Sequence, residues 1–157
     1  MPAELTGEVV EINISAEHKV LPRSVGRVRA IPGSGLEGDR NFYGDGAKRP
    51  KGDCELTLIA IEALDQLAAE HDIVLTAAES RRNLATSGID LNRLDGKRFR
   101  VGDVECEAIE LCEPCRRLER LTQPGVIRGL VHRGGLRATI LTEGEIAVGD
   151  AVAAVPD

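Results

Sequence analysis

Aromatic side chains are nearly absent from this chain of 157 residues, which has no tryptophan, one tyrosine and two phenylalanines. The core must therefore be aliphatic, and the aromatic platforms on which single-stranded nucleic acids stack are missing. A net charge of −6 also argues against general nucleic-acid binding. No apolar run approaches the roughly 18 residues of a membrane span, and the N-terminus lacks the basic and apolar regions of a signal peptide. We therefore expect a cytoplasmic protein that binds neither nucleic acid nor membrane.

Cysteine is also scarce, with four residues: Cys54, Cys106, Cys112 and Cys115. In a reducing compartment we expect these to be thiols or ligands rather than disulfides. A chain of this length can build a hydrophobic core without disulfides or metals. The length predicts one domain over residues 1–157.

Lysine is rare relative to arginine, which supplies sixteen of the 20 basic residues. Six arginines and a single acid, Glu119, fall between Cys115 and Arg137, so this window carries +5 in a chain of −6. The high overall share of arginine has an ordinary explanation in codon usage. The clustering beside Cys115 indicates a site for a small anionic ligand, because guanidinium groups bind phosphate and carboxylate with two parallel hydrogen bonds.

The hydrophobic pattern predicts a mainly β (α+β) fold. Alternating apolar residues and Gly-Asp turns predict strands at Thr6–Ser15 and Cys54–Ala60, a hairpin at Lys97–Leu111, and two or three strands at Leu136–Val155. One helix is predicted over Ile61–Ile73, with an apolar face of Ile61, Leu64, Leu67, Ala68 and His71, and a short one over Cys115–Thr122. The segments Arg27–Asp53 and Glu79–Gly88 are expected to be mostly loop. Many short strands with few helices favour a closed or nearly closed β-barrel with peripheral helices.

The segment Leu111–Glu119, LCEPCRRLE, carries the most specific candidate chemistry. A zinc site of Cys106, Cys112, Cys115 and His132 is one alternative, but its spacing matches no compact zinc module, and Cys106 lies in an alternating strand as a small core residue would. A redox dithiol is a second, although the thioredoxin-like βαβ context is missing. The third is a single activated thiolate at Cys115, at the start of a helix and followed by Arg116 and Arg117. Two inert, packed cysteines are the fourth.

Three further polar loops indicate a pocket on this strand-rich scaffold. Gly35–Asn41 is a glycine-rich turn that brings Asp39 and Arg40 to a ligand, and it does not fit a dinucleotide-binding loop. Arg81, Arg82 and Asn83 follow each other in a second loop. In the third, His132 and Arg133 precede two glycines that permit close backbone approach.

These motifs, GLEGDRN, RRNLATSGIDLNRLDGKRFRVGDVECE, LCEPCRRLE and HRGGLRATILTEGEIAVGD, resemble in order and spacing those of the MOSC domain family. This family comprises relatives of the C-terminal domain of molybdenum cofactor sulfurase and includes small standalone bacterial proteins. The resemblance covers about Thr6 to Val155 and implies a single MOSC domain with a barrel-like fold. It further implies a pocket cysteine that carries sulfur or ligates the molybdenum of a bound molybdopterin cofactor.

Carried over residue by residue, the family cysteine matches Cys115, and Cys112 has no general counterpart. The polar loops match Gly38, Asp39 and Arg40, and then Arg82, Asn83 and Leu84. The resemblance implies Cys115 as the molybdenum ligand and catalytic cysteine. The residues that surround the pterin and phosphate, with Asp39 and Arg40 at the rim, would be Arg81, Arg82, Asn83, Arg116, Arg117 and Arg133. A histidine often follows the GDR stretch in the family, whereas this chain has Asn41, so a proton-donor role of that histidine is either absent here or passes to His132.

Three functions follow from this resemblance. The first is a molybdenum-dependent reductase component for N-hydroxylated compounds, served by a separate reductase because the chain has no flavin, haem or iron–sulfur motif. The second is a sulfur carrier with a persulfide on Cys115, loaded by a separate cysteine desulfurase, since the chain is too short to include a pyridoxal-phosphate domain. The third is a non-catalytic module that senses cofactor or a small anion.

Overall fold

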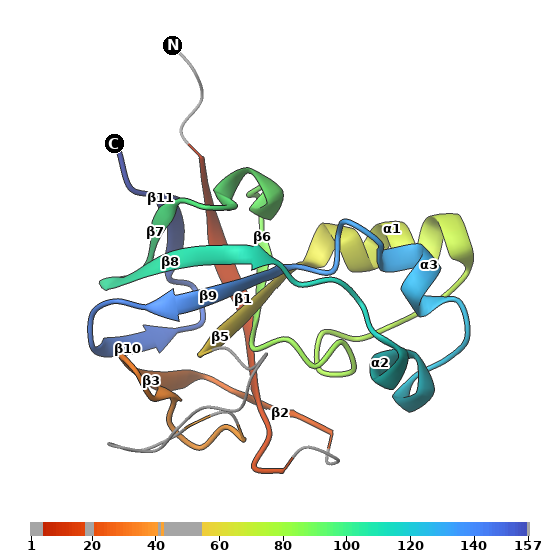
Figure 1. Ribbon diagram of the computed structural model, residues 1–157, viewed down its shortest axis with the longest axis horizontal. Coiled ribbons are helices and arrows are strands. Elements are labelled where there is room, and N and C mark those ends of the chain that lie inside the picture. The colour runs from red at the N-terminus through yellow and green to blue at the C-terminus, as the bar shows by residue number, and fades with distance from the viewer. Residues whose placement is uncertain (1–4, 18–20, 41, 43–54, 157) are drawn as a thin grey trace.

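The structure is a computed structural model that describes residues 5–17, 21–40, 42 and 55–156. Strands dominate these ranges, and short helices gather on one side (Figure 1). The strands are β1 (Thr6–Ile14), β2 (Arg23–Val25), β3 (Arg27–Ile31), β4 (Gly35–Leu36), β5 (Leu56–Ala60), β6 (Leu84–Ser87), β7 (Arg98–Val101), β8 (Val104–Leu111), β9 (Leu136–Ile140), β10 (Gly144–Ala147) and β11 (Ala151–Ala154). The helices are α1 (Ile61–His71), α2 (Arg116–Leu121), α3 (Val126–Leu130) and the 3₁₀-helix η1 (Leu91–Leu94).

Seven strands close into a barrel in the order β1-β11-β7-β8-β9-β5-β6, and β6 returns to β1. All neighbours are antiparallel except β5 and β6, which are joined by the α1 crossover that a parallel pair requires. Strand β1 is long enough to pair with three strands: with β11 near its start, with β2 near its end, and with β6 on both sides of a bulge between Val9 and Glu11. The predicted mainly β, barrel-like fold is confirmed.

A second, three-stranded sheet has the order β10-β3-β4. Its strands β3 and β4 lie inside Arg27–Asp53, which the sequence predicts as mostly loop. The hydrophobic side chains Val28, Ala30, Leu36 and Ile146 of this sheet pack into the same cluster as the barrel strands. The prediction of loop was too broad because glycine and proline mark the turns of this sheet without excluding short strands between them.

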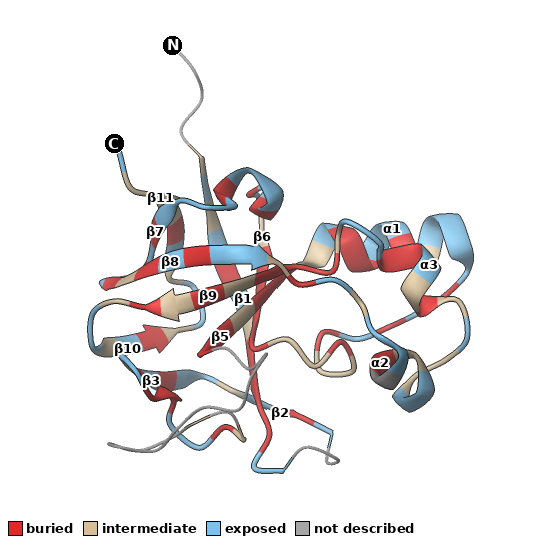
Figure 2. Ribbon diagram, in the orientation of Figure 1, coloured by how far each residue is buried: buried red, intermediate tan, exposed pale blue. Residues whose placement is uncertain are grey.

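Two hydrophobic clusters explain where the helices sit. The larger collects alternate residues of the barrel strands, among them Leu56, Leu58 and Leu84. The smaller lies between the barrel and the helices, where Ile59 of β5 and Ala85 of β6 pack with residues of α1, α2 and α3. Figure 2 shows the corresponding buried stripe along α1. Strands β5 and β6 are thus covered on both faces.

Burial on both faces is why the sequence pattern did not predict strand β6. Leu84, Ala85 and Thr86 are all fully buried, so β6 lacks the alternation of a half-exposed strand. The expectation that Glu79–Gly88 is mostly loop is wrong for Leu84–Ser87. The predicted face of α1 is also partly corrected. Leu64 and Leu67 are buried as expected and are joined by Ala63, whereas His71 is exposed.

Candidate functional site

The three cysteines that the structure describes occupy different environments. Cys115 is exposed and is the N-cap residue of the predicted short helix α2, where its side chain makes no capping hydrogen bond. Cys112 is buried at the end of β8, and its amide donates to the carbonyl of Gly135 at 2.7 Å. Cys106 is fully buried inside the barrel, and burial, with smaller effects of Glu55 and Glu105, raises its pKa to about 12. Of these three thiols, only that of Cys115 is exposed to solvent.

The alternative zinc site gains no support from this arrangement. Across the described residues, no three His, Cys, Asp or Glu side chains come together as a group that could hold a metal ion. Cys106 instead serves as the small core residue that its alternating strand predicts. Cys54 lies outside the described residues.

Arg82 connects the loops that the sequence singled out. Its Nε donates to the carbonyl of Gly134 at 2.8 Å, and Nη2 donates to the carbonyl of Cys112 at 3.1 Å. A longer contact of 3.4 Å joins Nη1 to the carbonyl of Ser80. One guanidinium group therefore holds the segment before β6 against the end of β8 and the start of β9. The fork of Arg82 satisfies carbonyl groups that the end of a strand leaves without a partner.

The two glycines of the HRGG motif permit close backbone approach, as expected, and the groups they approach are other backbone segments of the protein. A Cβ atom on Gly134 would lie 2.4 Å from the carbonyl oxygen of Cys112 and 3.1 Å from the ring of Pro114. On Gly135, which has φ +107°, it would lie 1.8 Å from the carbonyl oxygen of Leu58. The loop before β9 is thus pressed against both β5 and the CEPC segment.

His132 and Glu113 form a pair across these two loops. The Glu113 carboxylate accepts a hydrogen bond from the backbone amide of His132 at 2.7 Å, and its other oxygen lies 2.9 Å from Nδ1 of the imidazole ring. The side-chain amide of Asn92 donates to the carbonyl of His132 at 2.7 Å. These contacts hold His132 at φ 62°, a conformation that non-glycine residues rarely adopt. With Nδ1 tied to Glu113, Nε2 is the ring atom left for a proton transfer.

The rim residues Asp39 and Arg40 are linked to the same loops. Asp39 is buried, and its carboxylate accepts a hydrogen bond from the amide of Ser15 at 3.0 Å and lies 3.5 Å from the Arg40 guanidinium. Arg40 in turn reaches the carbonyl of Arg81 at 3.5 Å. Arg81 has φ 62°, a second strained position at the site. The GDR turn and the RRN loop are therefore neighbours, as the pocket interpretation requires, and Asn41 lies outside the described residues.

Asn83 and Arg133 direct their polar groups into the protein. Asn83 is buried; its carbonyl oxygen accepts from the amide and hydroxyl of Thr57, and its NH₂ group donates to the carbonyl of Asn13. The guanidinium of Arg133 donates to Gln66 at 2.7 Å and to Glu70 at 2.6 Å, both on α1. Asn83 thus ties β6 to its two flanking strands, and Arg133 ties the HRGG loop to α1.

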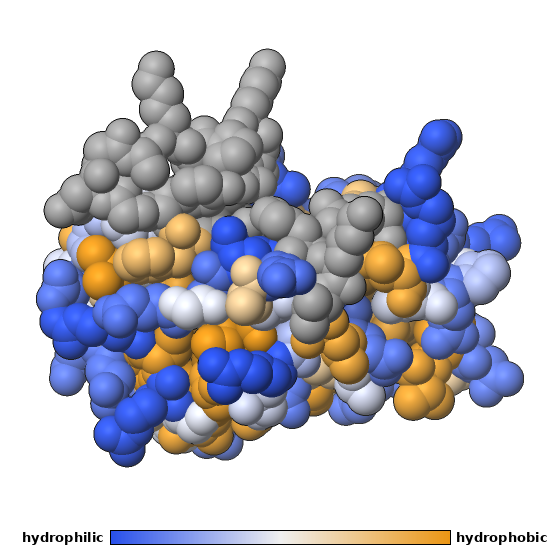
Figure 3. Space-filling model, turned by 90° about the horizontal axis from the view of Figure 1, so that it is seen from below, coloured by the Kyte–Doolittle hydropathy of each residue, from blue (hydrophilic) through white to orange (hydrophobic). Residues whose placement is uncertain are grey.

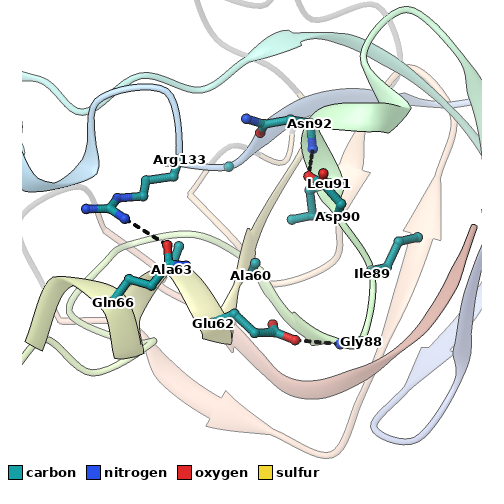
Figure 4. A pocket seen from close by; sticks show the side chains of 11 residues that line it. Ala60, Glu62, Ala63, Gln66, Gly88, Ile89, Asp90, Leu91, Asn92 and Arg133 are labelled. Atoms are coloured by element: carbon teal, nitrogen blue, oxygen red, sulfur yellow. Dashed lines mark hydrogen bonds between the residues drawn. The ribbon is translucent and has the colours of Figure 1, made fainter. Parts of the chain in front are cut away.

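A pocket of about 480 Å³ adjoins the HRGG loop (Figure 4). The first turns of α1, the segment 88–92 and the HRGG loop form its walls, with Ala60, Ala63 and Leu91 among the apolar residues. In Figure 4 the Glu62 carboxylate points at Gly88, and Arg133 reaches toward Gln66. Arg133 belongs to this pocket, whereas Cys115 does not line it.

The arginine-rich window forms α2 and α3. Arg116, Arg120 and Arg128 are exposed, and none makes an ion pair with a described residue. Arg117 is part of α2, but its side chain lies outside what the structure describes. The acid of the window, Glu119, accepts hydrogen bonds from the backbone amides of Gly125 and Ile127 and so caps α3.

Sequence reasoning did not identify Glu113, Asn92 and Glu119 as functional or positioning residues. The hydrogen-bond partner of Glu113 lies 19 positions away in the chain and that of Asn92 lies 40 positions away, whereas the partners of Glu119 lie within 8 positions. Only Glu119 had a local signal, as a carboxylate shortly before the Pro124-Gly125 turn that opens α3. Separately, none of the helices formed by the described residues is long and apolar enough to span a membrane.

Comparison with known proteins places these features in a family. The family model "MOSC domain" matches residues 38–153. The YUAD protein of Bacillus subtilis has a similar crystal structure, with a TM-score of 0.79, 18% identity and 97% coverage of both chains. YiiM from Geobacillus stearothermophilus matches with a TM-score of 0.73, 15% identity, and coverage of 96% of this chain and 75% of that one. YiiM from Escherichia coli matches with a TM-score of 0.70, 17% identity, and coverage of 96% of this chain and 70% of that one. No functionally curated protein matches the sequence.

Proposed function

The chain belongs to the MOSC domain family, which is typically associated with the molybdenum cofactor, and we propose that it binds this cofactor with Cys115 as the molybdenum ligand. The observation that carries the proposal is the position of Cys115, an exposed thiol in the CEPC segment, which Arg82 links to the HRGG loop through the carbonyls of Cys112 and Gly134. Thiolate sulfur is the soft ligand that such a metal accepts. The buried thiols of Cys106 and Cys112 are not available for this role.

The surrounding residues fit an anionic pterin phosphate in part through groups that the protein leaves free. Arg116 follows Cys115 directly, is exposed and makes no ion pair with a described residue. Arg81, Arg82, Asn83, Arg117 and Arg133 complete the proposed binding set, with Asp39 and Arg40 at its rim. Since Arg82 and Arg133 already bind the protein, we propose that they chiefly hold the loops in place and present backbone groups to the cofactor.

The proposed reaction is the reduction of an N-hydroxylated compound. The N–O bond breaks, two electrons arrive from a separate reductase, two protons are taken up, and the products are the reduced nitrogen compound and water. The bound cofactor would supply two-electron redox chemistry. Among the chain's own residues, His132 would donate a proton from Nε2, while Glu113 holds the ring through Nδ1.

Metal analysis tests this proposal directly. The protein would be expressed in a host with intact cofactor biosynthesis and purified without oxygen. Stoichiometric molybdenum and pterin in the wild type, lost in Cys115→Ser and retained in the core variant Cys106→Ala, is the expected result. Absence of molybdenum from the wild type, or its full retention in Cys115→Ser, would disprove the proposed ligand.

The exposure of Cys115 also favours the second candidate, a sulfur carrier. Here a persulfide on a cysteine desulfurase transfers its outer sulfur to the Cys115 thiol, which leaves a thiol on the donor and a persulfide on Cys115. Intact-mass measurement after incubation with a desulfurase and cysteine would show the added mass of one sulfur atom on the wild type and none on Cys115→Ser. A non-catalytic sensor would instead retain ligand binding in Cys115→Ala.

A further inference from the structure

Some exposed arginines pair with a glutamate, and others make no ion pair with a described residue. Arg23, Arg93 and Arg100 are of the second kind but lie on three separate elements, β2, η1 and β7. Outside α2 and α3, several are matched by glutamates on the neighbouring strand, as in Arg27–Glu145 at 3.2 Å and Arg98–Glu107 at 3.6 Å. On α2 and α3, Arg116, Arg120 and Arg128 have no such partner among the described residues. The positive charge of these two helices is therefore not neutralised locally.

The single acid in the window binds backbone amides and forms no ion pair with these arginines. Glu119 is half-buried, and one carboxylate oxygen accepts from the amides of Gly125 and Ile127 at 3.0 and 3.2 Å. Its charge is used to cap α3. The helices α2 and α3 thus carry four of the six arginines of the window and its one acid, in a chain that is acidic overall. The other two, Arg133 and Arg137, lie outside these helices and pair with Glu70 and Glu110.

Exposed aliphatic side chains accompany these arginines. Leu121 at the end of α2 and Val131 after α3 are about half exposed, at 46% and 49%, and Val74 is 75% exposed. The side-chain amide of Gln123, between α2 and α3, donates to the carbonyl of Val74, which places Val74 beside the α2–α3 connection. In Figure 3, hydrophobic and strongly hydrophilic groups alternate at the end of the molecule that carries the helices. Arginine beside apolar groups is a composition enriched at protein interfaces.

We propose that the α2–α3 face, defined by Arg116, Arg120, Arg128, Leu121, Val131 and Val74, is the docking surface for an acidic protein that delivers electrons to the site at Cys115. Cys115 is the N-cap residue of α2, so a partner seated on this face lies beside the reacting thiol. The inference rests on the proposed function for what the partner delivers.

Charge complementarity selects a protein over other anionic partners. The chain has almost no aromatic residues with which to stack the bases of a single-stranded nucleic acid. A two-fold symmetric contact with a second copy would bring the same positive face against itself. An acidic protein surface satisfies the arginines and covers the aliphatic residues at once.

The experiment uses an acidic [2Fe–2S] ferredoxin as the probe, titrated into the ¹⁵N-labelled wild-type protein at low salt. We expect chemical-shift changes concentrated in α2 and α3. The variant Arg120→Glu/Arg128→Glu should bind at least about tenfold more weakly. The matched control Arg23→Glu/Arg100→Glu changes charge equally at exposed positions on β2 and β7 and should bind the probe as the wild type does. Binding should also weaken at about 0.5 M salt.

Several outcomes would overturn the inference. These are equal weakening in the two double variants, shift changes spread over the whole surface, or no saturable binding of the ferredoxin. Tighter binding of anionic vesicles or a single-stranded oligonucleotide to the same face would assign it to a different partner. Self-association in sedimentation that disappears in Arg120→Glu/Arg128→Glu would assign it to a second copy of the chain.

Molybdenum analysis of the same proteins separates this inference from the proposed function. Arg120 and Arg128 lie outside the proposed cofactor set, so their double variant should retain molybdenum. If no protein in the series contains molybdenum, the proposed function fails while the docking result stands by itself.

Discussion

Replacing Arg82 with methionine tests whether this residue positions the loop that carries Cys115. The substitution keeps the aliphatic stem and removes two good hydrogen bonds, to the carbonyls of Gly134 at 2.8 Å and Cys112 at 3.1 Å, and a longer one to Ser80. Hydrogen bonds from charged donors contribute about 1.5–3 kcal/mol each. Because the guanidinium is half-buried and water can reach part of the gap, we expect a total loss of roughly 2–4 kcal/mol.

Urea denaturation and thermal unfolding of the cofactor-free protein measure this loss. For a chain of this size the melting temperature should fall by roughly 4–16 °C. Hydrogen exchange supplies a local measure, since the amide of Cys112 donates to the carbonyl of Gly135 and should lose protection. The control Arg100→Met removes an exposed arginine on β7 and should change stability by less than about 0.5 kcal/mol.

The reasoning would be refuted by an Arg82→Met protein that is as stable as the control variant and keeps the protection of the Cys112 amide. In that case the three contacts contribute nothing, and any effect of Arg82 on molybdenum content would have to arise from direct contact with the cofactor. Because the measurement is made without cofactor, a loss of stability cannot be attributed to a missing ligand.

Three further substitutions or conditions give clear expectations. Burial raises the pKa of Cys106 to about 12 from an unfolded value of 9.0, so the unfolded state loses this proton first as the pH rises. The free energy of unfolding, measured by urea denaturation, should therefore fall above pH 9, by roughly 1–1.5 kcal/mol at pH 10. This loss should vanish in Cys106→Ala, and the same pH dependence in that variant would count against the reasoning. Gly134→Ala should lower the free energy of unfolding by more than about 2 kcal/mol, because the new Cβ would lie 2.4 Å from a backbone carbonyl oxygen. The control Gly26→Ala, whose Cβ would have nothing within 4 Å, should be close to neutral. Equal melting temperatures of the two variants would disprove the tight packing at Gly134. Glu119→Ala should remove the α3 cap and cost about 0.5–2 kcal/mol, read from urea midpoints, and an unaltered midpoint would show that the cap is dispensable.

Most of the elements that could be predicted from sequence have one face in water; β5, which is covered on both faces, is an exception. Strand β1 and the β7–β8 hairpin alternate between buried and exposed residues, so their side-chain period is visible. Strand β6 could not be predicted in this way because Leu84 faces the barrel interior while Ala85 faces the helices. Its position depends on α1 covering the barrel, which is a tertiary contact rather than a local pattern.

The candidate site could also be predicted only in part, because some of its features depend on tertiary contacts. Motifs identified Cys115 and the polar loops, and the structure links the GDR, RRN, CEPC and HRGG loops by hydrogen bonds. What the motifs could not show is the direction of each side chain. Arg82 spans 52 positions of sequence to reach Gly134, and Glu113 spans 19 to reach His132. A motif shows which residues are present. Whether a given side chain contacts a ligand or holds a loop in place depends on partners that lie far away in the chain.

The pairing that closes the barrel has a mechanical consequence. Strand β1 meets β11 with Thr6 opposite Ala153 and Glu8 opposite Ala151, and both outer ends of this pair lie far from α2 (Figure 1). A force applied between the two ends of the chain would pull on Thr6 and Ala153 at the same edge. It would therefore break the hydrogen bonds of this ladder one after another, as a zipper opens, instead of loading all of them together in shear. The barrel should yield at low force in single-molecule pulling, and its seam should open first at the side remote from Cys115.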